Sequence, residues 1–243
     1  HSLKYQEGVH EMEKIIGILG GMGPLATVDL FQKIVSQTEV DFDEDHIHII
    51  IDNNPQIPSR IDYIFNSGES PLNQLIKSAL KLEMMGVDVI VMPCITAHYF
   101  YKDIVQFLNI TFINMVEETV REINRGCKVG LLSSEGTSKM GIFADFLKKY
   151  NIDFIKPDGK MQQYVTEIIY DVKKGRQNYN KARLLKVLER MKCEGVDLFV
   201  LGCTELPIAF RHMNISETYI DPTDILARRA IEFAGKRVMG VRR

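Results

Sequence analysis

Two cysteines occupy matching positions in two copies of one apolar pattern. Residues 86–100 read GVDVIVMPCITAHYF and residues 195–210 read GVDLFVLGCTELPIAF, so Cys94 and Cys203 align when the leading glycines are superimposed. An apolar run without polar alternation is typical of a strand buried on both faces of a parallel sheet. In such sheets ligands bind outside the carboxyl ends of the strands. The repeat therefore predicts one thiol at the ligand crevice of each half-chain, which suits acid–base chemistry on both faces of a small substrate.

Hydroxyl side chains also follow the predicted strands, at Thr96, Ser134, Thr137 and Thr204. Their ordinary role is to cap the next helix, and binding of a carboxylate together with backbone amides is compatible with that role. His98 comes one helical turn after Cys94. The sequence leaves open whether His98 orients or activates the thiol, or only packs in the first turn of a helix.

Residues 21–26 form a glycine loop that satisfies G-x-G-x-x-A between a predicted strand and a predicted helix. That pattern is the dinucleotide fingerprint, with Asp52 available as the ribose acid. The same loop can bind a small carboxylate at a helix N-terminus, or simply make a tight turn. The next loop, NNPQIPSR at 53–60, contains two prolines and an arginine, which favours a small acidic ligand over a dinucleotide.

Three cations stand where they could hold a carboxylate. Arg60 closes the proline-containing loop, and Lys173 and Lys174 end a predicted helix. Arginine offers a planar fork for bidentate capture of a carboxylate. The alternative for each is a solvated surface charge, which at a helix end also suits the dipole.

The composition is that of an ordinary soluble globular chain. Of 243 residues 45% are hydrophobic and 26% charged, and the net charge is −2. This balance offers no electrostatic case for nucleic acid or an anionic membrane. No apolar run approaches the roughly 20 residues of a spanning helix, and no secretory signal pattern opens the chain. We therefore expect a cytoplasmic protein.

The spacing of the cysteines also fits a cytoplasmic protein. The four cysteines lack the clustered spacing of a disulfide framework, so we expect reduced thiols. Cys94, His98 and Cys203 could be imagined as zinc ligands, but neither CxxC nor HxxxH supports them and no metal is predicted.

Strands and helices alternate along the whole chain, which predicts an α/β fold with parallel sheets. Outside the two cysteine strands, strands are predicted at 14–20, 46–52, 111–115, 128–134, 153–156 and 219–221. Helices are predicted at 25–38, 71–85, 116–125, 160–174 and 181–193, with others beginning near Thr96, Gly136 and Pro222.

The repeat argues for two pseudo-symmetric lobes, each a parallel β-sheet flanked by helices, with the active site in the cleft between them. We place the first lobe at 12–115 plus 222–243 and the second at 116–221. Residues 1–11 lack periodicity, and we expect an expression remnant or a disordered tail there.

Together and in order, these segments resemble the aspartate/glutamate racemases that work without pyridoxal phosphate, particularly the aspartate racemases. The resemblance covers residues 14–235. It is carried by ILGGMGP at 18–24, NNPQIPSR at 53–60, MPCITAH at 92–98, GLLSSEGT at 130–137 and GCTEL at 202–206. It implies that Cys94 and Cys203 flank the substrate α-carbon between two lobes, that no cofactor is needed, and that the chain forms a homodimer.

The resemblance also assigns substrate-binding residues. They are Met22, Gln56, Arg60, Ile95, Thr96, Ser134, Thr137, Lys173 or Lys174, and Thr204. Arg60 and one of the two lysines would hold the side-chain carboxylate; unbroken helical register favours Lys174. Ile95 departs from the family, which usually has Asn directly after the first cysteine. Losing that amide would cost about 1–3 kcal/mol, so the substrate is held differently or activity on aspartate is weak.

We therefore expect a racemase that interconverts L- and D-aspartate, with glutamate as the next choice. One cysteine as thiolate removes the α-proton and the other as thiol returns one, so the site must stabilise a thiolate. Three alternatives stay open at this point. They are a hydrolase or decarboxylase with a single active thiol, a binding protein that lost turnover because of Ile95, and a dinucleotide-dependent enzyme.

Overall fold

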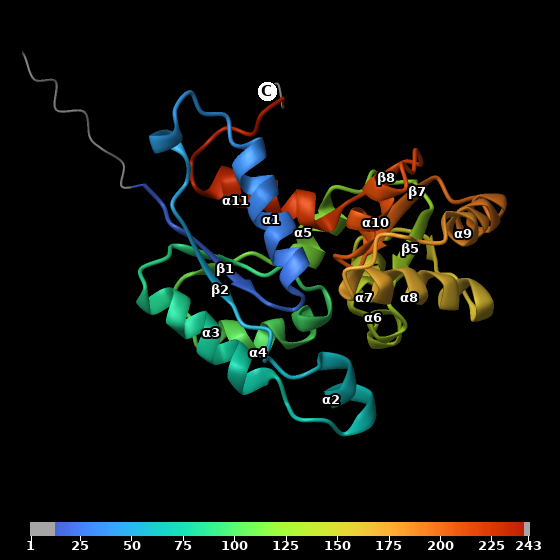
Figure 1. Ribbon diagram of the computed structural model, residues 1–243, viewed down its shortest axis with the longest axis horizontal. Coiled ribbons are helices and arrows are strands. Elements are labelled where there is room, and N and C mark those ends of the chain that lie inside the picture. The colour runs from blue at the N-terminus through green and yellow to red at the C-terminus, as the bar shows by residue number, and fades with distance from the viewer. Residues whose placement is uncertain (1–12, 241–243) are drawn as a thin grey trace, which may run out of the picture.

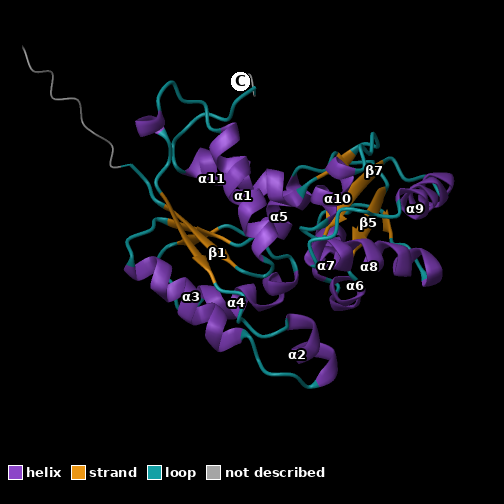
Figure 2. Cartoon of the chain, viewed as in Figure 1, coloured by secondary structure: helices purple, strands orange, loops and turns teal. Residues whose placement is uncertain are grey.

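The chain folds into two parallel four-stranded sheets, shown in Figure 2 by the orange strands. The structure is a computed structural model that describes residues 13–240, so the expectation for residues 1–11 lies outside the described residues. The first sheet has the order β2-β1-β3-β4 and the second β6-β5-β7-β8. Their strands are β1 (Ile16–Gly20), β2 (Ile49–Asn53), β3 (Val89–Val91), β4 (Thr111–Phe112), β5 (Val129–Ser133), β6 (Phe154–Ile155), β7 (Leu198–Gly202) and β8 (Tyr219–Ile220).

Helices cover both faces of each sheet (Figure 1). In the first half of the chain they are α1 (Pro24–Gln37), α2 (Arg60–Asn66), α3 (Leu72–Met84), α4 (Tyr101–Val105) and α5 (Met115–Arg121), with 3₁₀ turns η1 (Asp43–Asp45) and η2 (Thr96–Phe100). In the second half they are α6 (Glu135–Met140), α7 (Ile142–Lys149), α8 (Gly159–Lys173), α9 (Lys181–Cys193), α10 (Leu206–His212) and α11 (Pro222–Phe233). Within residues 13–240 we find no helix with both the length and the apolar content needed to span a membrane.

The two strand orders are the same once β2, β1, β3 and β4 are matched to β6, β5, β7 and β8. Each cysteine follows the third strand of its order, β3 or β7. These two strands and their neighbours β1 and β5 consist almost entirely of buried residues, because helices cover both faces. The predicted fold, with two similar α/β lobes, is confirmed.

The two lobes share part of their hydrophobic core. Each has its own apolar cluster, but a further cluster joins β1 and β3 of the first sheet to β5 and β7 of the second. Helix α11 returns to the first lobe and packs against α1 and α5 (Figure 1). The lobe boundaries at residues 116 and 222 stay a prediction, because this shared core crosses them.

Several elements differ from the sequence-based expectation. Helix α2 was not predicted; it is short and has no buried residue, so hydrophobic periodicity could not reveal it, and the Ser59 hydroxyl caps it by accepting from the Asp62 N–H. The strand expected at 46–52 runs instead from Ile49 to Asn53. The helix expected from Thr96 begins as the 3₁₀ turn η2 and becomes α4 only at Tyr101.

Candidate active site

A cavity of about 260 Å³ lies where the two lobes meet. The first lobe contributes the glycine loop, Pro55 and Arg60, and the second contributes Lys173 and Glu205. A Cβ added to Gly23 would lie 3.8 Å from Glu205 Oε1, which shows how closely the lobes approach here. Two cations and one carboxylate therefore face a space suited to a small charged molecule.

Cys94 and Cys203 are both buried, with 3% and 7% exposure, and neither is among the residues that line this cavity. In their thiolate forms both nevertheless act on Lys173, which does line it. Burial lowers the pKa of Lys173, but the negative charge of Glu205 and the smaller contributions from either cysteine as a thiolate together outweigh burial, and the pKa is raised. Arg60 opposes the rise, so it too lies within electrostatic reach of Lys173. The predicted thiols and cations thus belong to one charged neighbourhood.

Glu205 accepts a hydrogen bond from the second thiol. Cys203 Sγ lies 2.9 Å from Glu205 Oε2, and the Thr204 hydroxyl donates to the same oxygen at 3.4 Å. Burial, followed by the negative charge of Glu205, raises the pKa of the Cys203 thiol well above its usual value, and the charge of Lys173 opposes this rise. Cys203 is therefore held as a thiol next to a carboxylate that can accept its proton.

The sequence analysis did not assign a role to Glu205, although it lies within the GCTEL segment. A carboxylate two residues after a candidate cysteine at a strand end was the available signal. Only the fold shows that its side chain turns back to the sulfur.

His98 holds the turn that carries Cys94. Its Nδ1 lies 2.8 Å from the Cys94 carbonyl oxygen, and its Nε2 accepts from the Met115 N–H at 3.1 Å. Because Nε2 is an acceptor, the ring proton sits on Nδ1 and is donated to Cys94. Burial lowers the pKa of His98 to about 4, so the ring is neutral at pH 7. Of the roles left open, positioning fits this geometry, and a cationic histidine beside the thiol does not.

The glycine loop is fixed by its own neighbours. The Gly21 N–H donates to Thr27 Oγ1 at 2.9 Å, and the Thr27 hydroxyl lies 3.4 Å from the Gly23 carbonyl. Gly21 has φ +96°, and a Cβ there would fall 2.3 Å from the Asn54 backbone, so only glycine allows this approach. Asp52, considered as a ribose acid, is paired with Lys81 at 2.8 Å. These contacts give the dinucleotide interpretation no support.

Arg60 lines the cavity, and part of its guanidinium makes no hydrogen bond within residues 13–240. Its Nη1 donates to the carbonyls of Ile57 and Pro58 at 3.2 and 2.9 Å, while the buried Nε has no hydrogen-bond partner among the residues described. Lys173, the last residue of α8, lines the cavity from the other lobe, and Lys174 is not among the lining residues. The structure thus places Lys173, and not the Lys174 that helical register favoured, in the cavity lining, and a role for either lysine in substrate binding stays a prediction.

The remaining predicted residues lie in different surroundings. Met22 is buried and lines the cavity. Ser134 and Thr137 are buried and bonded to each other at the start of α6, as a helix cap. Gln56 is exposed and does not line the cavity, and Ile95 is buried in the core shared by the lobes.

Two hydroxyls lie beside the thiols themselves. Thr96 Oγ1 is 4.0 Å from Cys94 Sγ, and Thr204 follows Cys203 directly and reaches Glu205. In the described part of the chain, no group of three or more His, Cys, Asp or Glu side chains is placed to hold a metal ion.

Paired lobes with a thiol at the same place in each, and a cavity where the lobes meet, define the class of two-lobed α/β proteins. Comparison with known proteins gives the family. The chain belongs to the Asp/Glu/hydantoin racemase family, which it matches over residues 19–230. It is also 30% identical over 222 residues to the broad-specificity amino-acid racemase of Bacillus subtilis (strain 168), covering 89% of this chain and 96% of that protein.

Two solved structures are similar to this chain in fold as well as in sequence. The aspartate racemase of Picrophilus torridus superimposes with a TM-score of 0.78 at 35% identity, covering 93% of this chain and 96% of the other. An aspartate racemase homologue from Pyrococcus horikoshii OT3 superimposes with a TM-score of 0.74 at 25% identity, covering 92% and 100%. The expected family is therefore confirmed, and the chain is a racemase-family enzyme.

Proposed function

We propose that this protein interconverts the enantiomers of an acidic amino acid, aspartate first and glutamate next, without a cofactor. The observation that carries the proposal is the Cys203–Glu205 pair at 2.9 Å, beside a cavity that Arg60 and Lys173 line. A thiol whose proton can be taken up and returned is what each face of a two-base racemase requires. The names of the relatives, an aspartate racemase and a broad-specificity amino-acid racemase, support the same activity.

In one direction the Cys94 thiolate removes the α-proton: the C–H bond breaks, an S–H bond forms, and the electron pair stays on the substrate as a carbanion. Cys203, whose thiol form is favoured by burial and by Glu205, then donates its proton to the opposite face. The other direction starts with Cys203 as the thiolate, its proton having passed to Glu205, and with Cys94 as the thiol, its proton having come from solvent before the lobes close. The Cys203 thiolate then removes the α-proton and the Cys94 thiol donates its proton to the opposite face. The two thiols thus exchange roles with the direction of reaction.

The charges of the cavity favour a dicarboxylic substrate. Such an amino acid carries two carboxylates and one ammonium group, and the lining offers two cations and one carboxylate. We assign the side-chain carboxylate to Arg60, through its unpartnered Nε, and to Lys173. Thr96, Thr204 and the Ser134–Thr137 pair are proposed to bind the head group together with backbone amides.

Substrate entry must involve opening of the lobes, because both thiols are buried. Closing again would exclude water, which strengthens the electrostatic interactions on which the carbanion depends. Reduced thiols are needed throughout, so we propose a reducing, cytoplasmic setting. The homodimer implied by the family also stays a proposal, and sedimentation velocity tests it.

Incubation in D2O with L-aspartate tests the function. We expect α-deuterium to appear together with D-aspartate, and we expect racemisation to collapse in both Cys94→Ser and Cys203→Ser. Retained racemisation in either variant would contradict the two-thiol scheme and favour a single active thiol. Wild-type protein that exchanges no α-hydrogen of any acidic amino acid, while a racemase control turns over, would refute the function.

A second candidate is a member of the fold that binds an acidic amino acid but turns it over weakly. Ile95 favours it, because this side chain is buried in the shared core and offers the substrate no hydrogen bond. Titration calorimetry that detects aspartate binding in protein with no isotope exchange would select this candidate.

A further inference from the structure

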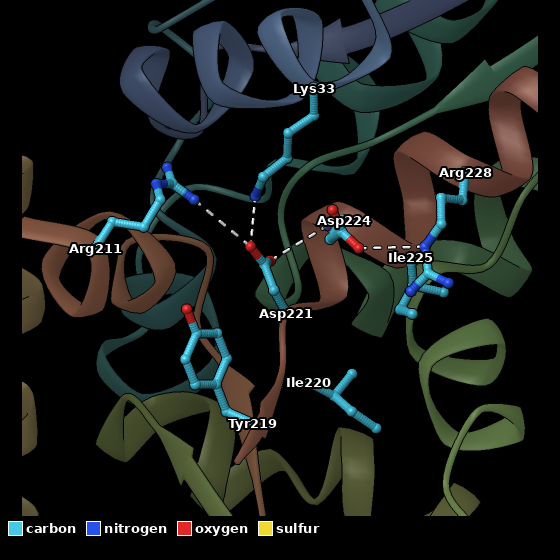
Figure 3. A pocket seen from close by; sticks show the side chains of 8 residues that line it. All are labelled: Lys33, Arg211, Tyr219, Ile220, Asp221, Asp224, Ile225 and Arg228. Atoms are coloured by element: carbon cyan, nitrogen blue, oxygen red, sulfur yellow. Dashed lines mark hydrogen bonds and ion pairs between the residues drawn. The ribbon is translucent and has the colours of Figure 1, made fainter. Parts of the chain in front are cut away.

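Four charged side chains join α1, α10 and the start of α11. Asp29 Oδ2 accepts from Lys33 Nζ at 2.7 Å, and its Oδ1 accepts from Arg211. Lys33 and Arg211 both point at the carboxylate of Asp221, at 2.5 and 3.7 Å (Figure 3). The side chains of Asp29, Lys33 and Asp221 are only 7%, 11% and 10% exposed. The pairs that Lys33 makes with Asp29 and Asp221 are therefore screened by water far less than the ion pairs on the surface, whereas Arg211 is itself 46% exposed.

The cluster borders a cavity of about 350 Å³ whose lining contains three cations and two carboxylates. The third cation, Arg228, pairs with Asp224 at 3.2 Å, and Asp221 receives the other two (Figure 3). Asp29 is not among the lining residues but pairs with Lys33 and Arg211, so the three cations face three carboxylates and the cluster has no surplus of positive charge for an anion. The charged side chains of the cluster instead connect α1 with α10 and with the start of α11.

The Asp29–Arg211 pair connects α1 and α10, two helices that both begin at the active-site cavity. Gly23 precedes α1 and Glu205 precedes α10, and these two residues approach each other across the cleft. Asp29 follows Gly23 by six residues, and Arg211 follows Glu205 by six. Six helical residues span about 9 Å. The two helices therefore approach each other at the cavity, and the Asp29–Arg211 ion pair joins them again about 9 Å further along each helix.

We propose that Arg211 is a positioning residue that, through Asp29, fixes the Cys203 turn against the first lobe. The turn is continuous with α10, because the Leu206 N–H donates to the Cys203 carbonyl at 3.0 Å. Releasing the far end of this short helix shifts Cys203 and Glu205 relative to a substrate held by the first lobe. This role rests on the proposed function. A displacement of about 1 Å at a reacting group can cost about 100-fold in rate.

Kinetics of Arg211→Gln test the role. We expect kcat to fall by about 10- to 100-fold while KM changes little, because Arg211 does not line the active-site cavity. Arg211→Lys should restore part of kcat, since it restores the charge. Arg190→Gln on α9 is the matched control, because it removes an exposed ion pair, to Glu194 at 2.9 Å, and should leave kcat unchanged. A fall in melting temperature with unchanged kcat would show a purely structural role and overturn the proposal.

Isotope exchange gives a readout that only a role at Cys203 affects. α-Deuterium uptake from each enantiomer in the Cys203→Ser variant identifies the enantiomer that Cys203 deprotonates. Arg211→Gln should slow exchange of that enantiomer more than exchange of the other, and equal slowing of both would overturn the proposal. A wild-type protein that exchanges neither enantiomer would instead refute the racemase function itself, so the two failures are distinguishable.

Discussion

At the scale of single residues, the two thiols do not have the same surroundings. Cys203 is bonded to the carboxylate of Glu205, whereas Cys94 lies near the Thr96 hydroxyl and its turn is held by His98. A carboxylate beside a buried thiol opposes the thiolate, but it can also take the thiol proton at the moment of reaction. We therefore expect the two directions of racemisation to depend differently on Glu205.

Replacing Glu205 with Gln tests this asymmetry. The substitution removes the negative charge that helps to raise the pKa of Cys203, so that pKa should fall. The pH at which Cys203 stops acting as a proton donor should move downwards in the pH profile of kcat/KM. Exchange of the α-proton of the enantiomer that Cys203 deprotonates should slow about 100-fold, within the usual contribution of a general base. Glu135→Gln, which removes an exposed carboxylate on α6, should change neither the pH profile nor the exchange; equal slowing of exchange from both enantiomers would contradict the assignment.

His98 links stability to pH. Its pKa is lowered from 6.5 to about 4 by burial, so the folded protein prefers the neutral ring. The stability that this preference confers is complete above pH 6.5 and is lost as pH falls towards 4. The full effect amounts to about 3 kcal/mol.

Urea unfolding of wild type and His98→Asn between pH 7 and pH 4 measures this contribution. We expect His98→Asn to be less stable at pH 7, because its shorter side chain leaves the Met115 N–H or the Cys94 carbonyl unpaired at a cost of about 1–3 kcal/mol. Its free energy of unfolding should also decline less with falling pH than that of wild type. Parallel pH curves for the two proteins would show that His98 is not the titrating group.

At the scale of elements, one residue of helix length decides which lysine lines the cavity between the lobes. Helix α8 ends at Lys173, and Lys174 is its C-cap. Lys173 lines the cavity between the lobes. Burial lowers its pKa, but the negative charge of Glu205 and the smaller contributions from either cysteine as a thiolate together outweigh burial, and the pKa is raised. A helix end is where sequence patterns are least reliable, since α-helices fray and change register there.

Lys173→Met and Lys174→Met form a matched pair for this point. Removing Lys173 should raise the KM for aspartate about 10- to 100-fold, as expected for a lost charge-assisted hydrogen bond of about 1.5–3 kcal/mol. The same change at Lys174 should alter KM less than about twofold, because Lys174 does not line the cavity. Steady-state kinetics with both enantiomers decide the matter, and a larger effect at Lys174 would reverse the assignment.

At the scale of the whole molecule, the two lobes are not independent. A single apolar cluster contains Ile18 and Val91 of the first sheet, Leu131 and Val200 of the second, and Leu226 of α11. Burial of this surface ties the stability of each lobe to the presence of the other. We expect the molecule to unfold as one cooperative unit, although its topology is that of two similar halves.

Truncation of one residue from each kind of core tests that expectation. Leu226→Ala opens the shared cluster and Leu188→Ala the cluster of the second lobe, and both side chains are fully buried. Each should lower the stability by about 2–5 kcal/mol, with circular dichroism and calorimetry reporting one transition. Two separated transitions, of which Leu188→Ala shifts only one, would show that the lobes unfold independently.

The sequence by itself determined the α/β class, the two similar lobes and the position of both cysteines at strand ends. It could do so because buried parallel strands leave continuous apolar runs, and here the run is repeated with a cysteine in the same place. Arg60 was likewise predicted, because its loop is marked by prolines and polar residues around a single cation, and the structure places it in the cavity lining.

Only the tertiary structure decided how the two halves work together. The bond between Glu205 and Cys203, the choice of Lys173 over Lys174, and the Asp29–Arg211 link between helices far apart in the chain depend on side-chain direction and on the packing of one lobe against the other. Periodicity in a sequence reports which face of an element is buried. It does not report which charged groups, separated by 182 residues along the chain, are brought into contact when those faces meet.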